Sequence, residues 1–260
     1  MKKYNVFKIL SIPNGVKPIS SGWVFVKKPC IGTEPARFKA QYIARGNSQL
    51  SGLYFQKTFS PTATFASLQI LLTLAAKSKL IIASFDFTAT YLNAYIDKKV
   101  WIHPPDGLVI PSGSGCKLNK ELYSTRQAGQ CWWSHLKNLL ASRAFKPSNY
   151  DLSVYINREI RLTVWLHVDD GIVFGKRQGN IENLQCLICE EFNIKWNNGL
   201  KHIVRIDIDQ TETGFHLSQP SLIQTIVNKY WDERHIPPTP LPEKYNMVSL
   251  TEKDKVVHQA

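Results

Sequence analysis

The feature that most constrains the fold is a set of short apolar runs that border aspartates. Residues 81–85 form an apolar run without a helical period, and the run leads directly into Asp86. Apolar residues alternate over 162–166 and again over 172–174, on either side of Asp169-Asp170-Gly171. Short apolar runs without a period of 3.6 predict buried strands, and alternation at period two predicts a hairpin. We therefore predict a strand that ends at Asp86 and a hairpin with aspartates at its tip.

Three carboxylates at one edge of a sheet would suit divalent cations. If the strand and the hairpin pair, then Asp86, Asp169 and Asp170 meet. Like charges at short distance repel unless cations neutralise them, and Mg²⁺ prefers carboxylate oxygens. Two ions about 4 Å apart can stabilise both the attacking and the leaving oxygen of an in-line displacement at phosphorus. We predict a site for two Mg²⁺ ions, or Mn²⁺, in which Asp86 and Asp169 contact both ions and Asp170 contributes less directly.

Asp170-Gly171 also has a simpler interpretation as a turn. Asp-Gly is among the strongest signals for a two-residue hairpin loop, and an isolated Asp-Asp-Gly says little about function. Both interpretations stay open from this segment alone. The strand that ends at Asp86 and the basic balance of the chain favour the metal site.

Composition indicates a globular protein with a polyanionic partner. Of 260 residues, 43% are hydrophobic, which is enough for a sizeable core. Lys and Arg number 32 against 20 Asp and Glu, and the field of the resulting +12 charge favours nucleic acid. The sequence contains neither an apolar run of about 18 residues nor the apolar stretch of a signal peptide. We expect no membrane segment and an intracellular location.

The five cysteines favour a reducing compartment over a disulfide scaffold. Cys186 and Cys189 have the spacing of zinc ligands, and His202 is the only further ligand type close downstream. The pair lies in residues 181–192, whose apolar spacing predicts an amphipathic helix. We expect buried helix cysteines, and a structural zinc site is the weaker alternative.

Periodicity and turn residues predict the remaining elements. Irregular surface segments are expected at 104–107 and 111–115, and a proline-rich segment at 237–242 closes the fold before a charged tail. Strands are expected at 23–26, 203–208 and 215–217, and helices at 66–79, 127–144 and 221–231, the last with Ser218 as a possible cap.

Ordered motifs along the chain resemble the reverse transcriptase of copia-type retrotransposon polyproteins. The resemblance covers residues 19–242. Its motifs are Phe38-Lys39-Ala40-Gln41-Tyr42-Ile43-Ala44-Arg45-Gly46, Thr58-Phe59-Ser60-Pro61, Phe85-Asp86 with Tyr91-Leu92-Asn93, Leu122-Tyr123-Ser124-Thr125-Arg126-Gln127-Ala128, His167-Val168-Asp169-Asp170 and Leu217-Ser218-Gln219-Pro220.

The resemblance implies an α+β fold of the right-hand polymerase type, with an antiparallel sheet plus helices. Fingers are expected over 1–81, a palm with the catalytic aspartates over 82–208, the start of a thumb or connection over 209–242, and a tail over 243–260. The implied activity is RNA-directed DNA polymerisation, which extends a primer on an RNA or DNA template with deoxynucleoside triphosphates.

Four further residues are implied nucleotide contacts. Tyr91 would abut the 2′ position of the sugar and reject ribonucleotides by a clash. Gln127 would lie near the incoming nucleotide and the template, while Lys39 and Arg45 would grip the triphosphate. Each also has a simpler interpretation: a packed aromatic for Tyr91, an exposed helix-start residue for Gln127, and solvated charges for the other two.

Departures from the family motifs suggest an alternative function. Gln41 stands where the family usually has Arg. Small residues or glycines are replaced at Thr90, Ala94, Ser124 and Arg205, where a side chain would crowd a close backbone approach.

A further change, His167 for the commoner Tyr, keeps a flat ring with a polar edge, and none of the changes touches the three aspartates. Nothing resembling a protease or integrase precedes Trp23, and no acidic cluster suited to a ribonuclease H follows Pro242. We expect a piece of a polyprotein, and the alternative is a catalytically inactive, truncated remnant that still binds nucleic acid.

Overall fold

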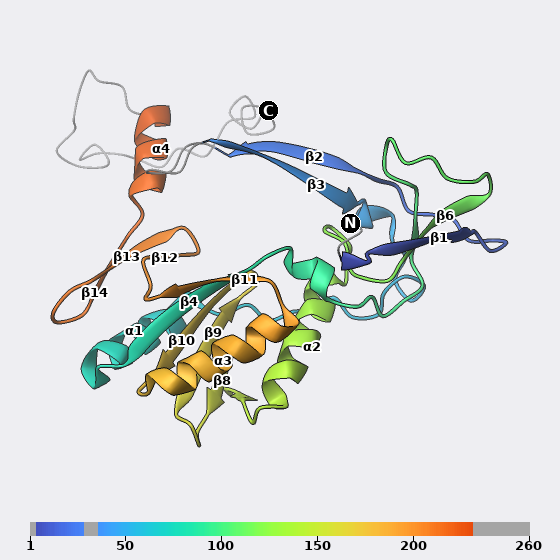
Figure 1. Ribbon diagram of the computed structural model, residues 1–260. Helices are drawn as coiled ribbons and strands as arrows, with labels where there is room; N and C mark the ends of the chain where they lie inside the picture. Colours follow the sequence, from blue (N-terminus) through green and yellow to red (C-terminus); the bar gives the residue numbers. More distant parts are fainter. Residues whose placement is uncertain (1–3, 29–35, 231–260) are drawn as a thin grey trace, which may run out of the picture. The chain divides into compact units, whose positions relative to one another are not determined.

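A computed structural model of the protein describes residues 4–28 and 36–230. The chain divides into two compact units, Met1–Ser218 and Gln219–Ala260. The first unit combines antiparallel sheets with helices, which is the α+β class that the sequence predicts (Figure 1). The predicted division into 1–81, 82–208 and 209–242 stays a prediction, and the predicted proline-rich closure and tail lie outside the described residues.

A six-stranded antiparallel sheet forms the centre of the first unit. Its order is β11-β4-β10-β9-β8-β7. The strands are β11 (Ile194–Asn198), β4 (Ile81–Phe87), β10 (Asp170–Gly175), β9 (Leu162–His167), β8 (Val154–Asn157) and β7 (Lys146–Pro147). The apolar runs around the aspartates are therefore strands, as predicted, because alternate side chains of each run pack on opposite faces.

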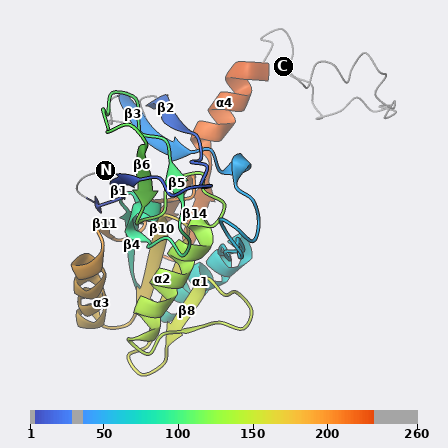
Figure 2. The ribbon, with the colours of Figure 1, turned by 90° about the vertical axis from the view of Figure 1, so that its right-hand side faces the viewer.

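Each face of this sheet has its own core. On one face, Phe85 and Val173 pack with α2 (Ala128–Ala141) and α3 (Gln178–Glu191). On the other face, Ile172 and Phe174 pack with α1 (Phe65–Ser78). Figure 2 shows α3 and α1 on opposite sides of β4 and β10. Because both faces are covered, β4 is a nearly continuous apolar run, and in β10 the residue between Ile172 and Phe174 is also apolar.

The N-terminus of α1 is fixed by a hydrogen-bonded cap. The Thr64 hydroxyl accepts from the Ser67 backbone N–H at 3.2 Å. Asp151 accepts from the Thr64 N–H at 2.9 Å and from the Ser67 hydroxyl at 2.7 Å. Burial raises the pKa of Asp151, but these hydrogen bonds outweigh it and leave the pKa lowered. The carboxylate thus satisfies the Thr64 N–H, which has no partner within the helix, and also accepts from the Ser67 hydroxyl.

The predicted helices are confirmed to within a few residues, but the prediction for the cysteines of α3 is wrong. The buried side chains of α3 are Ile181, Leu184 and Ile188, whereas Cys186 and Cys189 are exposed. The apolar face of the helix runs through positions three and four apart, and both cysteines fall outside it.

Three smaller sheets complete the described strands. They are β1 (Phe7–Ser11) with β6 (Ser114–Leu118) and β5 (Trp101–Ile102), β2 (Ser21–Lys28) with β3 (Arg37–Ala44), and β12 (His202–Ile203) with β13 (Ile206–Gln210) and β14 (Phe215–Ser218). The prediction of one strand over 203–208 is wrong. Val204 and Arg205 have φ of 47° and 64°, a left-handed conformation that turns the chain between β12 and β13.

The described part of the second unit is the helix α4 (Pro220–Tyr230). The helix starts with proline, which suits the first helical position because its missing N–H has no intrahelical partner there. Ser218 ends β14 and is not the residue that directly precedes the helix, so its predicted role as a cap is wrong. Among the helices of the described residues, none is long and apolar enough to cross a membrane.

Candidate active site at the paired ends of β4 and β10

The pairing of β4 with β10 brings two of the three aspartates opposite each other. Asp170 and Asp86 are Cα partners in the antiparallel register of these strands. Asp169 lies in the adjoining turn, where its carbonyl accepts from the Phe87 backbone N–H at 2.7 Å. Residues more than eighty positions apart in the sequence therefore meet at one edge of the sheet.

The turn between β9 and β10 consists of Val168 and Asp169. Val168 has a φ of 54°, which is costly for a β-branched residue, on the order of 1–2 kcal/mol. Its carbonyl accepts a hydrogen bond of 3.0 Å from the indole Nε1 of Trp132 in α2. The helix thus holds a strained turn in place directly beside Asp169.

The interpretation of Asp170-Gly171 as a simple turn is wrong, because both residues lie inside β10. Gly171 is required for another reason. A Cβ built on it would lie 2.2 Å from Cζ of Phe85, the residue directly opposite in β4. Glycine allows the Phe85 ring to pack against the backbone next to the aspartates.

The electrostatics of the aspartates suit a cation. Burial raises the pKa of Asp170, the neighbouring charges of Asp86 and Asp169 raise it further, and His167 and His202 oppose them. The Oδ1 atom of Asp169 is buried, and it has no hydrogen-bond partner among the described residues. A buried carboxylate oxygen without a donor, close to two further carboxylates, is a suitable ligand for a hard divalent ion.

A second group of ligand-type side chains lies elsewhere in the first unit. In residues 4–28 and 36–230, one such group has its ligating atoms within 4.8 Å of one another, and it consists of Asp97, Glu121 and Cys131. Burial raises the pKa of Glu121 to about 7, and the Thr125 hydroxyl donates to its carboxylate at 2.7 Å. Burial, with Glu121 nearby, also raises the pKa of the Cys131 thiol, so the thiolate that a metal would need is disfavoured.

Among the described residues, neither Cys186 nor Cys189 belongs to a group of three ligand-type side chains within 4.8 Å of one another, so the structure gives no support to the zinc alternative. The ligand atoms of the three aspartates do not all lie within 4.8 Å of one another either. Such a short spacing is expected for the ligands of one ion. The ligands of two ions about 4 Å apart are spread over a wider space.

The expected nucleotide contacts lie in different surroundings. Lys39 lines a cavity of about 410 Å³ together with Ala89 and Tyr123. Tyr91 lies in the 3₁₀ helix η3 (Thr90–Asn93), and its ring meets Tyr123 edge-on at 5.0 Å. Burial raises the pKa of Tyr91 and the charge of Asp169 raises it further, which reflects how close the tyrosine lies to the aspartates. Arg45 directly follows β3, is exposed, and does not line this cavity.

Gln127 is fully buried at 0% exposure, so its interpretation as an exposed helix-start residue is wrong. Its Oε1 accepts from Gln49 Nε2 at 3.1 Å, and Gln49 Oε1 accepts from the Arg126 backbone N–H at 2.7 Å. In this structure Gln127 joins the start of α2 to the segment after β3 and has no surface for a nucleotide.

Two of the replaced glycines lie at positions where glycine is favoured by conformation. Ser124 has a φ of 68° and Arg205 a φ of 64°. This left-handed conformation costs a residue with a Cβ more than it costs glycine. Crowding of a close backbone approach was the predicted reason for glycine, and this conformational reason is not visible in the sequence.

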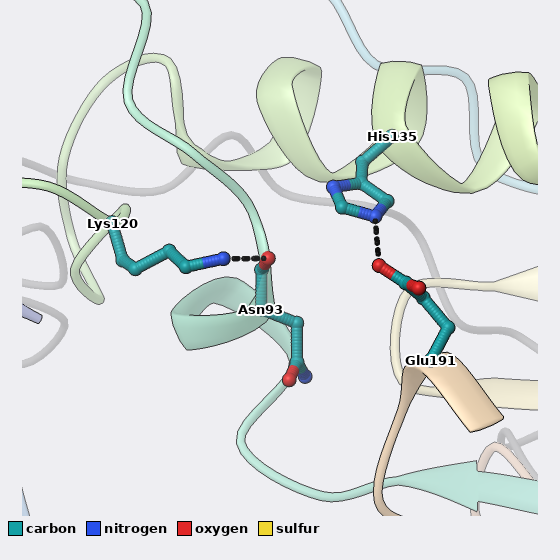
Figure 3. A network of polar contacts seen from close by, with 4 residues as sticks. All are labelled: Asn93, Lys120, His135 and Glu191. Carbon is teal, nitrogen blue, oxygen red and sulfur yellow. Dashed lines mark hydrogen bonds and ion pairs between the residues drawn. The ribbon is translucent and has the colours of Figure 1, made fainter. Parts of the chain in front are cut away.

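Side-chain contacts hold the elements around η3. Lys120 Nζ donates to the Asn93 carbonyl at 2.9 Å, at the end of η3 (Figure 3). The same ammonium lies 3.2 Å from the centroid of the Tyr95 ring. Figure 3 also shows His135 of α2 pointing at Glu191, the last residue of α3, with Nε2 and Oε1 3.3 Å apart. The segment that carries Tyr91 is thereby tied to its neighbours.

Known proteins that match this chain are transposon polyproteins and polymerases. It is 26% identical over 237 residues to the Retrovirus-related Pol polyprotein from transposon TNT 1-94 of Nicotiana tabacum, a match that covers 88% of this chain and 18% of that protein. It is 28% identical over 211 residues to the corresponding polyprotein from transposon RE1 of Arabidopsis thaliana, covering 80% of this chain and 14% of that protein. The chain thus spans less than a fifth of the length of these relatives.

Among solved structures, a foamy viral protease-reverse transcriptase in complex with double-stranded DNA matches with a TM-score of 0.44 and 13% identity, covering 86% of this chain and 35% of that one. The family described as "Reverse transcriptase (RNA-dependent DNA polymerase)" matches residues 4–233. That match spans most of the sequence, including all three aspartates and the motifs quoted above. The chain belongs to this reverse transcriptase family, in the form found in copia-type Pol polyproteins of transposons.

Proposed function

We propose that this chain adds deoxynucleotides to the 3′ end of a primer on an RNA or DNA template, with two Mg²⁺ ions held by Asp86, Asp169 and Asp170. One observation carries the proposal: Asp170 and Asp86 face each other across β10 and β4, and Asp169 follows in the adjoining turn. Manganese would fit the same oxygen ligands. Within the proposal, residues 1–81, 82–208 and 209–242 are fingers, palm and the start of the thumb.

The protein's part in this reaction is to hold carboxylates on rigid elements. Asp86 and Asp170 come from neighbouring strands of a sheet that is packed on both faces, so their separation is fixed by the backbone. Asp169 Oδ1 is available for an ion because nothing in residues 4–28 and 36–230 donates to it. When bound, the two ions supply charge stabilisation for the attacking and leaving oxygens.

The surroundings are suited to a nucleotide and a nucleic-acid strand. Lys39 places a cation at the cavity of about 410 Å³, and Tyr91 lies between that region and Asp169. In β2 and β3, Phe25 is 75% exposed and Phe38 is 86% exposed, and such aromatic faces can stack on bases. We assign Arg45 an exposed phosphate contact and Gln127 an indirect part, through the position of α2.

Primer extension tests the proposal directly. The chain should extend an oligo-dT primer on poly-rA with dTTP in the presence of Mg²⁺, and Asp169→Asn should lower the rate by at least about 100-fold, a loss typical for a group that stabilises transition-state charge. Asp106→Asn is the matched control, because Asp106 is an exposed aspartate in the loop before β6. Equal extension by both variants would refute the assignment of Asp169.

The rival function is nucleic-acid binding without catalysis. Its support is the left-handed conformation of Ser124 and Arg205, where the chain lacks the family's glycines, together with the +12 charge. This rival predicts binding that weakens steeply with salt, as counterion release requires, and no incorporation with either metal. Incorporation that depends on Asp169 would exclude it.

A further inference from the structure

Tyr123 lies where the cavity at Lys39 meets the segment that carries Tyr91. It lines that cavity of about 410 Å³, a volume within the range of small-molecule sites. Among the described residues that line the cavity, Lys39 is the only charged one. The ring of Tyr123 also meets the Tyr91 ring edge-on at 5.0 Å, although Tyr91 does not line the cavity. Tyr123 therefore belongs both to the cavity wall and to the surroundings of η3.

The charges of the aspartates act on Tyr123. Burial raises its pKa, the charge of Asp169 raises it further, and the charge of Asp86 does so more weakly. Electrostatic interactions weaken with distance. An effect of both carboxylates on one phenol therefore reflects a position close to the candidate metal site.

A second tyrosine of the same cavity differs in this respect. Tyr42 also lines the cavity, but its hydroxyl donates to the His103 carbonyl at 3.1 Å. Burial raises the pKa of Tyr42, and the charges that raise it further are those of Cys116 and Asp106. Of the two phenols, Tyr123 is the one on the side of the aspartates.

Backbone contacts fix Tyr123 relative to the strand that carries Lys39. The Tyr123 carbonyl accepts from the Ala44 N–H at 3.0 Å, and Tyr123 forms an isolated parallel bridge with Ile43. Ile43 and Ala44 are the last two residues of β3, the strand that contains Lys39. The cation and the phenol are thereby held on one hydrogen-bonded framework.

The groups around Tyr123 define a ligand with several negative charges. A lysine cation and ions held by carboxylates both attract anionic oxygens. A phenol is protonated at neutral pH, so it donates a hydrogen bond without adding charge. A triphosphate chain carries oxygens for all three kinds of group.

We propose that Tyr123 is a substrate-binding residue whose phenol O–H donates to the triphosphate of the incoming deoxynucleotide, alongside Lys39. This inference rests on the proposed polymerase function, and it adds one residue to the four expected nucleotide contacts.

A purely structural part for Tyr123 is the competing explanation, because its ring packs on Tyr91. Phenylalanine keeps the ring and removes only the hydroxyl. Tyr123→Phe therefore separates the two explanations: it behaves as the wild type if only the ring matters, and it binds triphosphate more weakly if the hydroxyl donates.

Equilibrium binding of dTTP to the full chain is the first test. Ca²⁺ replaces Mg²⁺ and no primer is present, so that no nucleotide is added. In titration calorimetry, Tyr123→Phe should weaken dTTP by about 10-fold, the value of a hydrogen bond to a charged group. Inorganic tripolyphosphate should be weakened to the same extent, because the contact is made to phosphate. Tyr150→Phe is the matched control, because Tyr150 is 100% exposed and does not line the cavity.

Primer extension on poly-rA supplies the second readout. Tyr123→Phe should raise KM for dTTP by about 10-fold and change kcat by less than about 2-fold, because the contact is already made in the bound substrate. Unchanged far-ultraviolet circular dichroism and melting temperature ensure that the variant is folded.

Equal dTTP affinity of Tyr123→Phe and the wild type would overturn the inference, as would absence of dTTP binding by the wild type at about 1 mM. Extension by the wild type with an unchanged KM in Tyr123→Phe would overturn it as well, and would leave the polymerase function in place. Weakened dTTP binding in Tyr123→Phe without extension by the wild type would instead support the phosphate contact and refute the polymerase function.

Discussion

Replacing Gly171 by alanine should be among the most destabilising single changes in the central sheet. The added Cβ would lie 2.2, 2.4 and 2.7 Å from three ring atoms of Phe85. Carbon atoms pack best at about 3.5–4.0 Å, so the ring or the strand must move by more than an ångström.

The Phe85 ring cannot move freely. It is 2% exposed, stacks on Trp196 at 5.4 Å with an interplanar angle of 4°, and meets Phe87 edge-on at 5.2 Å. Overpacking a full core typically costs about 1–3 kcal/mol, and a contact this short on a wedged ring lies at or beyond the upper end. We expect Gly171→Ala to lower the free energy of unfolding by about 3 kcal/mol.

Urea unfolding measures this loss, and Gly179→Ala is the matched control. Gly179 lies in the first turn of α3, and nothing lies within 4 Å of a Cβ placed on it. Alanine there should be neutral or stabilising by up to about 1 kcal/mol, because glycine loses more backbone freedom on folding. If Gly171→Ala stayed within about 0.5 kcal/mol of the wild type, the close packing of Phe85 on the β10 backbone would be refuted.

Three further predictions concern the surroundings of the site. Because burial raises the pKa of Glu121 from 4.5 to about 7, its favourable contribution is present below pH 4.5 and is lost as the pH rises through 7. Glu121→Gln should remove this pH dependence, which amounts to at most roughly 3 kcal/mol in urea unfolding at a series of pH values. Ser124→Gly should raise the unfolding free energy by up to about 1 kcal/mol in thermal melts, because it relieves a φ of 68°. Trp132→Phe keeps a ring against Phe87 but loses the donor to Val168; it should cost about 1–3 kcal/mol and raise the Mg²⁺ concentration needed for half-maximal primer extension.

The sequence predicted three strands of the central sheet, β4, β9 and β10, because their signal is local, whereas β7, β8 and β11 were not predicted. The apolar run before Asp86 and the alternation around Asp169 and Asp170 correspond to β4, β9 and β10. β4 contains a nearly continuous apolar run, and β9 and β10 have apolar residues two positions apart, so the signal lies in neighbouring residues. Pairing of these strands was expected to bring the aspartates together, and the register of β4 and β10 places Asp86 opposite Asp170. Their roles in metal binding stay predictions.

The features that the sequence did not predict depend on three-dimensional context. Valine and arginine at positions 204 and 205 do not predict a left-handed turn. One strand was therefore predicted where β12 and β13 lie. The exposure of Cys186 and Cys189 depends on which face of α3 meets the sheet. Gln127 is buried because Gln49, a residue far away in the chain, offers it a hydrogen bond. The spacing of neighbouring residues in the sequence does not reveal such partners.

The position of the aspartates is fixed by the core rather than by the aspartates themselves. Val173 packs on the α2 and α3 face and Ile172 on the α1 face, so a slip of one residue between β4 and β10 would exchange the two faces. That exchange would turn each apolar side chain toward the opposite face and lose its packing. Asp170 lies at the start of β10 and belongs to neither core, so it loses no such packing. The alignment of Asp170 with Asp86 therefore follows from the apolar residues between them, and it would survive changes at the aspartates. For this reason a copy of the chain that has lost these carboxylates can keep the fold.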